Sequence, residues 1–294
     1  MRKLKKIITS NEFNVDENKI TTVYKTGNIT ELITPYHRNN SLKKIRKLNK
    51  TQYVDCKTGE IKEYKRGNNR SNNIQSIQRS LANLRRIINS NFTGDNSERF
   101  LTLTYSTLMT DTNKLYKDFK KFICALRKHY PVEYITIAEP QQSGSLHLHV
   151  LLKSLTTKKL HISIEILSEL WPHGYFYIEK IPFVDNFGAY FAVRVTDLCP
   201  DDDHIGKSNI PKSVIKGGRL HFYSKNFKVY RCSKGIKRPL PMQMTYGEAR
   251  KLTENMKLCF SSSKQIISVN EEGDEKTLNT IYYEQYKFKE VLKA

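Results

Sequence analysis

The stretch VEYITIAEPQQSGSLHLHVLL, residues 132–152, decides the fold. It contains two apolar runs rich in strand-forming residues, Val132 to Ala138 and Leu146 to Leu152, and both are typical of β-strands. The connection between the runs is short and contains Gly144, so the strands are expected to pair as an antiparallel hairpin. The sequence therefore predicts two neighbouring antiparallel strands at this point.

Two histidines lie inside the second strand, at His147 and His149. Residues two apart on a strand point to the same face, so both imidazoles converge while the leucines beside them bury the other face. Two imidazoles in this position can share one metal ion. A pair of hydrogen-bonded structural histidines is the alternative, and it is the commoner outcome for an isolated pair.

Glu139 ends the first strand, eight positions before His147. A tight hairpin through Gly144 brings its carboxylate near the two rings. Two imidazoles and one carboxylate leave open coordination positions, which suit Mn²⁺ or Mg²⁺ engaging a phosphate oxygen. The sequence therefore predicts a divalent-metal site formed by Glu139, His147 and His149. A surface glutamate in the hairpin is the alternative for Glu139.

Segments on both sides of the hairpin also show regular periodicity. Strands are expected at Arg99–Tyr105 and Tyr175–Lys180, and helices at Thr112–Lys128, Ile162–Leu170 and Asn186–Thr196. An earlier amphipathic helix is indicated by apolar residues at helical spacing, namely Ile74, Ile77, Leu81, Leu84, Ile87 and Ile88. This order predicts an α+β fold in which helices pack on one face of a central antiparallel sheet, with the opposite face free for a ligand.

The two ends of the chain differ from this central part. Residues 1–72 are rich in Asn, Lys and Thr with little periodicity, so we expect an irregular basic N-terminal extension. Residues 73–240 form the expected central domain. Residues 241–294 form a small C-terminal appendage without a legible role, with a helix at Tyr246–Leu258 and strands at Gln265–Val269 and Thr277–Tyr283.

The charge of the chain is strongly positive. Lys and Arg total 50 against 29 Asp and Glu, a formal charge of +21, which indicates a polyanionic partner, with nucleic acid first. An anionic membrane surface, or no partner at all, is the alternative. No apolar run approaches membrane length and no signal peptide is visible, so a cytoplasmic protein is expected. The five cysteines are far apart without a C-x-x-C pair, which predicts reduced thiols and no zinc cluster.

Residues 207–238 carry ten Lys or Arg and no Asp or Glu, interleaved with aromatic residues. Basic side chains neutralise backbone phosphates while aromatic rings stack on unpaired bases, at roughly 1–3 kcal/mol per base. This composition predicts binding of single-stranded DNA, and a solvated basic face or disordered loop is the alternative. The residues expected to bind DNA are Lys216, Arg219, Lys225, Lys228, Arg231, Lys234, Lys237, Arg238, Tyr223 and Tyr230.

Three segments carry a resemblance to a known family: FLTLTY at 100–105, AEPQQSGSLHLH at 138–149 and LWPHG at 170–174. Together they resemble the rolling-circle replication initiators of small bacterial plasmids and filamentous-type phages, within the HUH endonuclease superfamily. The resemblance covers residues 75–240. It implies a ferredoxin-like sheet that presents His147 and His149 to a divalent metal, with Glu139 in the third ligand position.

The resemblance also implies a tyrosine nucleophile on a downstream helix. Tyr190 matches that position, Val193 stands where the family commonly has lysine, and Arg194 stands where a second tyrosine commonly sits. Arg194 is four residues after Tyr190, on the same helical face, and can supply the missing cation. A buried structural aromatic is the alternative for Tyr190. The fallback nucleophiles would be Tyr175, Tyr177, Tyr223 and Tyr230.

The activity implied by the resemblance is origin-specific nicking and rejoining of single-stranded DNA through a 5′-phosphotyrosyl link. The chain has no G-K-[ST] phosphate-binding loop, so a host helicase would unwind the template. A mobilisation relaxase or a transposase is a rival within the same chemistry, and the order of histidines before tyrosine favours the initiator. A repressor-like nucleic-acid-binding protein with a decayed site is the non-enzymatic alternative.

Overall fold

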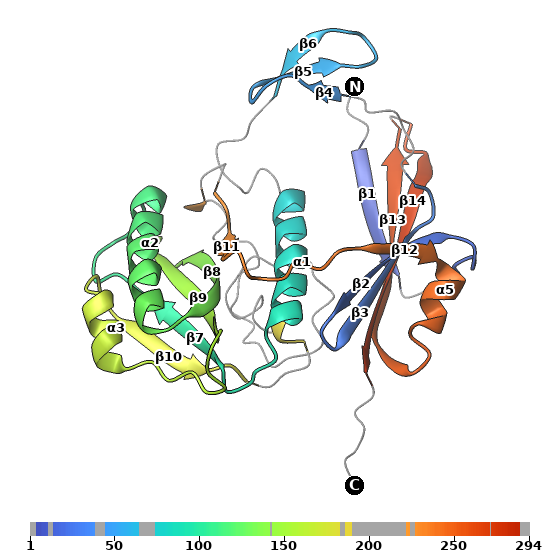
Figure 1. Ribbon diagram of the computed structural model, residues 1–294. Coiled ribbons are helices and arrows are strands. Elements are labelled where there is room, and N and C mark those ends of the chain that lie inside the picture. The colour runs from blue at the N-terminus through green and yellow to red at the C-terminus, as the bar shows by residue number, and fades with distance from the viewer. Residues whose placement is uncertain are drawn as a thin grey trace.

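The computed structural model describes residues 4–10, 14–38, 45–64, 74–141, 143–182, 186–189, 222–223, 227–270 and 272–288. Within these ranges the chain forms three sheets of antiparallel strands, together with helices that pack on the two larger sheets (Figure 1). The smallest sheet has three short strands, β4 Ile45–Lys47, β5 Gln52–Asp55 and β6 Ile61–Glu63. None of the described helices is long and apolar enough to cross a membrane.

The central sheet has five antiparallel strands in the order β10-β7-β9-β8-β11. Their bounds are β7 Glu98–Leu103, β8 Val132–Pro140, β9 Leu146–Ser154, β10 Phe176–Lys180 and β11 Tyr230–Cys232. Four of these strands are the four predicted from sequence, within a few residues at each end. The α+β class with a central antiparallel sheet is therefore confirmed.

The predicted hairpin is present as β8 and β9. Its register pairs Glu139 directly with His147, and Ile137 with His149. Gly144 in the connecting turn has a φ of 82°, a left-handed conformation that side chains other than glycine's disfavour. The turn therefore fixes the register that sets Glu139 beside the histidines.

Two helices cover one face of the central sheet (Figure 1). Helix α2, Thr112–His129, begins at Asp111, whose carboxylate accepts hydrogen bonds from two backbone amides of the first turn. Helix α3, Ile164–Leu170, follows β9. The ring of Phe119 in α2 lies 5.3 Å from that of Tyr134 in β8, which shows the packing of α2 on the sheet.

Helix α1, Ile74–Asn91, lies on the opposite side of the sheet, the face that carries His147 and His149, called here the histidine face (Figure 1). Lys153 belongs to the same alternating set of β9 as the two histidines, and its Nζ donates to the carbonyl of Asn91 at 2.7 Å. The helices therefore do not all lie on one face as expected. The histidine face also carries apolar residues, Phe100, Ile135 and Leu151, and the apolar stripe of α1 buries against that side.

The second large sheet is built from both ends of the chain. Its strand order is β1-β13-β14-β3-β2-β12. The bounds are β1 Leu4–Ser10, β2 Ile20–Thr26, β3 Ile29–Pro35, β12 Met242–Thr245, β13 Met256–Val269 and β14 Glu275–Phe288. The expectation of an irregular segment over residues 1–72 is wrong for these strands. Their partners lie far away in sequence, as in the pairing of Ile29 with Lys287, so local periodicity does not reveal them.

The C-terminal helix is shorter than predicted. Helix α5 spans Tyr246–Lys251 and starts with a capping box between Thr245 and Glu248. The predicted helical residues from Met256 onwards instead begin β13, where Met256 pairs with Phe288 of β14. The two predicted C-terminal strands are parts of the long hairpin formed by β13 and β14.

The six-stranded sheet is joined to α1 by buried charges. Glu31 of β3 has a side chain that is 1% exposed, and it accepts hydrogen bonds from the guanidinium groups of Arg85 and Arg86 in α1. The hydroxyl of Tyr283 in β14 donates to the same carboxylate at 2.8 Å. Helix α1 is therefore held between the two large sheets.

Candidate metal centre

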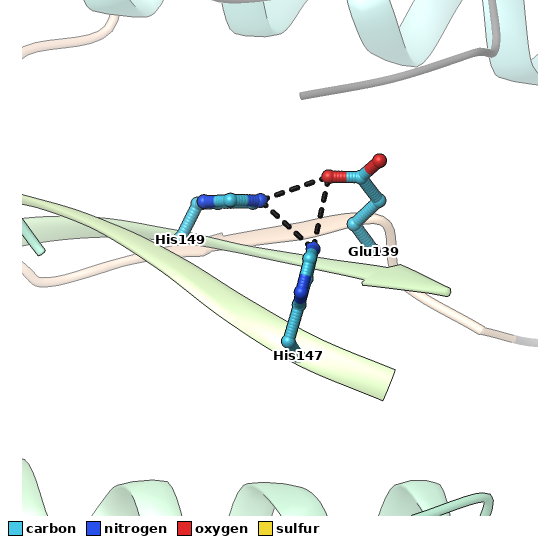
Figure 2. A group of neighbouring side chains, drawn as sticks. All are labelled: Glu139, His147 and His149. Carbon is cyan, nitrogen blue, oxygen red and sulfur yellow. Dashed lines mark hydrogen bonds and ion pairs between the residues drawn. The ribbon is translucent and has the colours of Figure 1, made fainter. Parts of the chain in front are cut away.

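Three side chains point toward one another on the histidine face (Figure 2). The Nε2 atoms of His147 and His149 lie 3.1 and 2.8 Å from the same oxygen of Glu139, Oε2. The two Nε2 atoms are 3.0 Å apart. The structure thus brings together the three residues that the sequence grouped as metal ligands.

The spacing of these atoms fits a six-coordinate ion. With bonds of about 2.1 Å, neighbouring ligand atoms of an octahedral ion lie about 3.0 Å apart, whereas a tetrahedral zinc site needs about 3.3 Å. The observed 2.8, 3.0 and 3.1 Å match one face of an octahedron. Such a face leaves three positions for water or substrate oxygens.

A set of hydrogen bonds without a cation satisfies this geometry poorly. Both imidazoles would have to donate to one carboxylate oxygen, which crowds two N–H groups at an Nε2 separation of 3.0 Å. A shared cation instead accepts a lone pair from each of the three atoms. The donor set therefore favours a metal site over a structural histidine pair.

Glu139 has the charge that a ligand needs. Burial acts to raise the pKa of its carboxyl, but hydrogen bonds from His147 and His149 outweigh burial, and the pKa lies below its ordinary value. The side chains of all three residues are only 11–15% exposed. At neutral pH Glu139 is therefore an ionised carboxylate in a largely desolvated position.

Neighbouring side chains orient the two rings. The Nδ1 atom of His149 lies 3.2 Å from Oγ1 of Thr102, and the Nδ1 atom of His147 lies 3.0 Å from the side-chain amide of Gln141. The ring of Phe100 stacks on His149 with centroids 5.4 Å apart. Metal-bound imidazoles usually donate their outer N–H to such partners; the Thr102 hydroxyl can accept it, and so can the Gln141 amide with its oxygen toward the ring.

The sequence analysis did not identify Thr102 or Gln141 as part of the site. Gln141 stands inside the hairpin segment that carried the family resemblance, two residues after Glu139. Thr102 is set beside His149 only by the pairing of β7 with β9. The alternating pattern of β7 was the one available signal, since it shows that Thr102 and Phe100 share a face.

Two of the fallback tyrosines lie on the histidine face. The strand register places Tyr177, Thr102, His149, Ile137 and Tyr230 in one row across the sheet. Tyr177 and Tyr230 are therefore two strands away from His149 on either side, at roughly 10 Å. Tyr177 is 60% exposed, whereas burial raises the pKa of the half-buried Tyr230.

Tyr223 does not fit the roles expected for it. Its side chain is 1% exposed, its hydroxyl donates to the carbonyl of Ala138 at 2.9 Å, and its ring stacks on Phe227. A ring buried in this way has no free face for a base, and its hydroxyl is already engaged. The expectations that Tyr223 stacks on DNA or acts as a fallback nucleophile are therefore wrong.

The basic residues of the expected DNA-binding segment divide into two groups. Lys228, Arg231, Lys234, Lys237 and Arg238 are exposed. The guanidinium of Arg231, however, lies 3.4 Å from the ring centre of Tyr116 in α2, on the face opposite the histidines. Lys216, Arg219 and Lys225 lie outside the described residues.

Tyr190 and Arg194 also lie outside the described residues, but the residues just before Tyr190 are described. The backbone N–H of Gly188 donates to Oδ1 of Asn89 at 2.6 Å, and Nδ2 of Asn89 donates to Oδ1 of Asn186 at 2.8 Å. A Cβ atom on Gly188 would meet the carbonyl oxygen of Arg85 at 2.3 Å. Residues 186–189 are thus fixed against α1, on the histidine side of the sheet.

Comparison with known proteins supports one functional class. Residues 98–198 match the family described as Replication-associated protein ORF2. No curated protein and no solved structure gives a significant match to the chain. The matched residues begin with β7, include Glu139, His147 and His149, and run past Tyr190. The match supports a replication initiator and a role in DNA replication.

Proposed function

We propose that this chain is a rolling-circle replication initiator of the HUH type, which nicks and rejoins single-stranded DNA at a replication origin. The observation that carries the proposal is the convergence of Glu139, His147 and His149, which lie inside the region that matches the replication-associated family. All three ligands are present and both rings are oriented by neighbours, which argues against a decayed site.

The division of chemical labour follows from the residue types. A bound Mn²⁺ or Mg²⁺ would draw charge from the scissile phosphodiester. Glu139, His147 and His149 would hold that ion. Tyr190 is the proposed nucleophile; because a phenol has a pKa near 10, its proton must be removed during attack.

The reaction is a transesterification. The phenolic oxygen of Tyr190 forms a bond to phosphorus as the bond from phosphorus to the 3′ oxygen breaks, and the departing 3′ oxygen takes up a proton. The product is a 5′-phosphotyrosyl link with a free 3′-hydroxyl. Attack by that 3′-hydroxyl, or by another, reverses the step and rejoins the strand, so no nucleotide cofactor is consumed.

Cations of the chain bind the strand and stabilise the phosphate. Arg194 is proposed to supply the cation beside Tyr190, in place of the lysine common in the resembling family. The exposed residues Lys228, Lys234, Lys237 and Arg238 add positive charge for the DNA backbone. A host helicase would supply the unwinding.

A covalent adduct tests the proposal. The protein is incubated with Mn²⁺ and single-stranded oligonucleotides tiled across its own replicon, and denaturing gels are examined for a protein–DNA species. We expect an adduct with one origin segment, and none with Tyr190→Phe because the nucleophilic oxygen is gone. Tyr177→Phe, which removes an exposed hydroxyl on the same face, should retain it.

Two outcomes contradict this proposal in different ways. Absence of any adduct across the tiled set rejects the nicking activity. An adduct that survives Tyr190→Phe but disappears in Tyr177→Phe keeps the activity and moves the nucleophile to β10.

The residues that orient the histidines give a second prediction. Thr102→Val keeps the shape of the side chain but removes the partner of His149 Nδ1, so Mn²⁺ affinity measured by calorimetry should fall about 10- to 100-fold. Thr136→Val is a matched control, because the buried Oγ1 of Thr136 has no hydrogen-bond partner among the described residues. Equal Mn²⁺ affinities for Thr102→Val and the wild type would reject the orienting role.

A further inference from the structure

A pocket of about 210 Å³ lies between α1, β2 and the segment that follows β11. Two tyrosines and two arginines contribute to its lining, Tyr24, Tyr230, Arg86 and Arg238, together with the side chain of Asn83. Such a volume is below the roughly 300–1,000 Å³ typical of sites for whole small molecules. The pocket has room for one flat group.

The polar groups of the pocket differ in how well they are paired. Arg86 is neutralised by Glu31, and its guanidinium lies 3.8 Å from the ring centre of Tyr24. Within the part of the chain that the structure describes, Arg238 has no acidic partner and the amide of Asn83 has no hydrogen bond. The pocket therefore offers a free cation and a free amide beside aromatic rings.

The position of the pocket relates it to the metal centre. Tyr230 lies in the same cross-strand row as His149, two strands away at roughly 10 Å. At the rise of about 3.4 Å per nucleotide in stacked DNA, that distance corresponds to about three nucleotides, and to fewer in an extended strand. A strand held at the metal centre can therefore reach the pocket.

We propose that this pocket binds one base of the single-stranded DNA, within about three nucleotides of the phosphate at the metal centre. The inference rests on the proposed function, since it takes single-stranded DNA as the substrate. Tyr24 and Tyr230 supply aromatic surface for the base, and Arg238 contacts a flanking phosphate.

Asn83 gives the pocket a preference among bases. Its amide carries both donors and an acceptor, and asparagine pairs in a bidentate manner with N6 and N7 of adenine. The amide projects from α1, a helix fixed on both sides by the two large sheets. The base in the pocket is therefore adenine.

Binding measurements without cleavage test the pocket. In EDTA, fluorescence anisotropy gives the Kd of the tightest-binding oligonucleotide of the tiled set, and of versions in which one abasic site moves along it. For the wild type, we expect one position at which base removal weakens binding about tenfold. Tyr230→Ala should bind the intact strand about tenfold more weakly and lose no more at that position. Tyr36→Ala, an exposed tyrosine outside the pocket, should behave as the wild type.

Two further variants separate the contacts without disturbing buried residues. Asn83→Ala should abolish the preference for adenine at the position found by the abasic scan. Arg238→Ala should reduce the dependence of log Kd on log salt by about one unit, as for one lost phosphate contact. Arg46→Ala, on the outlying strand β4, is the matched control. Equal abasic profiles for the wild type and Tyr230→Ala would overturn the proposal.

The outcomes separate the pocket from the nicking activity. Coupling between Tyr230 and one base, without any covalent adduct, rejects nicking and keeps the pocket. An adduct without such coupling keeps nicking and rejects the pocket. Calorimetry with free dAMP tests the other source of a base: micromolar binding that Tyr230→Ala removes would overturn the DNA assignment and indicate a site for a free nucleotide.

Discussion

His147→Ala is expected to lower the rate of covalent adduct formation about a thousandfold while the Kd for single-stranded DNA stays within about twofold. Loss of one imidazole leaves two of the three converging ligands and weakens the hold on the ion that draws charge from the phosphate. DNA affinity depends mainly on phosphate contacts from basic residues, which the substitution does not touch. His149→Ala should give the same pattern.

Metal dependence supplies the control for this result. EDTA should abolish adduct formation by the wild type, and Mn²⁺ should restore it in the wild type but not in His147→Ala. His161→Ala removes an exposed histidine outside the centre and should leave the rate unchanged. Loss of DNA binding together with adduct formation would indicate a structural role for the pair. Full activity of both variants would exclude the two histidines as ligands.

The parts of this site that could be predicted from sequence depend on local geometry. Alternation along one strand places His147 and His149 on one face, and a short turn through Gly144 sets Glu139 opposite them. Both relations span fewer than twenty residues. The ring contacts of Thr102 and Phe100 come from a strand some forty residues earlier, and only the sheet order brings them to His149.

Longer-range pairing explains what the sequence did not reveal. The strands β2 and β3 are ordinary alternating segments, but their neighbours β12 and β14 lie at the other end of the chain. Glu31 looks like an exposed residue in such a strand, and only the approach of α1 buries it. The early end of α5 has a related cause, since the apolar pattern of Met256 and Leu258 is compatible with either a helix or a strand.

Helix α1 connects these long-range elements to the chemistry. Asn89 holds the residues that precede Tyr190, and Asn83 lines the pocket proposed for a base. Arg85 and Arg86 bind Glu31 of the six-stranded sheet. The hairpin turn between β2 and β3 also approaches α1, where a Cβ on Gly27 would meet the carbonyl of Asn89 at 2.4 Å. The sheet built from the chain ends therefore fixes the helix that borders the site.

Glu31→Ala is expected to lower the free energy of unfolding by about 3–5 kcal/mol, because it leaves two guanidinium groups buried without a counter-charge. The side chains of Arg85 and Arg86 are only 13% and 9% exposed, so water compensates them poorly. Urea denaturation at pH 7 measures the effect. Glu272→Ala, in an exposed turn, is the control and should change the free energy by less than about 0.5 kcal/mol.

The same contact gives the stability of the protein a defined pH dependence. Burial acts to raise the pKa of Glu31, but Arg85 and Arg86 outweigh burial, and the pKa in the folded protein lies below the ordinary 4.5. A lowered folded pKa means that the contribution of Glu31 is complete above the unfolded pKa and is lost as the pH falls through the folded pKa. The wild type should therefore lose stability in acid more steeply than Glu31→Ala. Parallel acid profiles, or a loss at pH 7 no larger than that of Glu272→Ala, would contradict a buried ionised carboxylate joining α1 to the sheet.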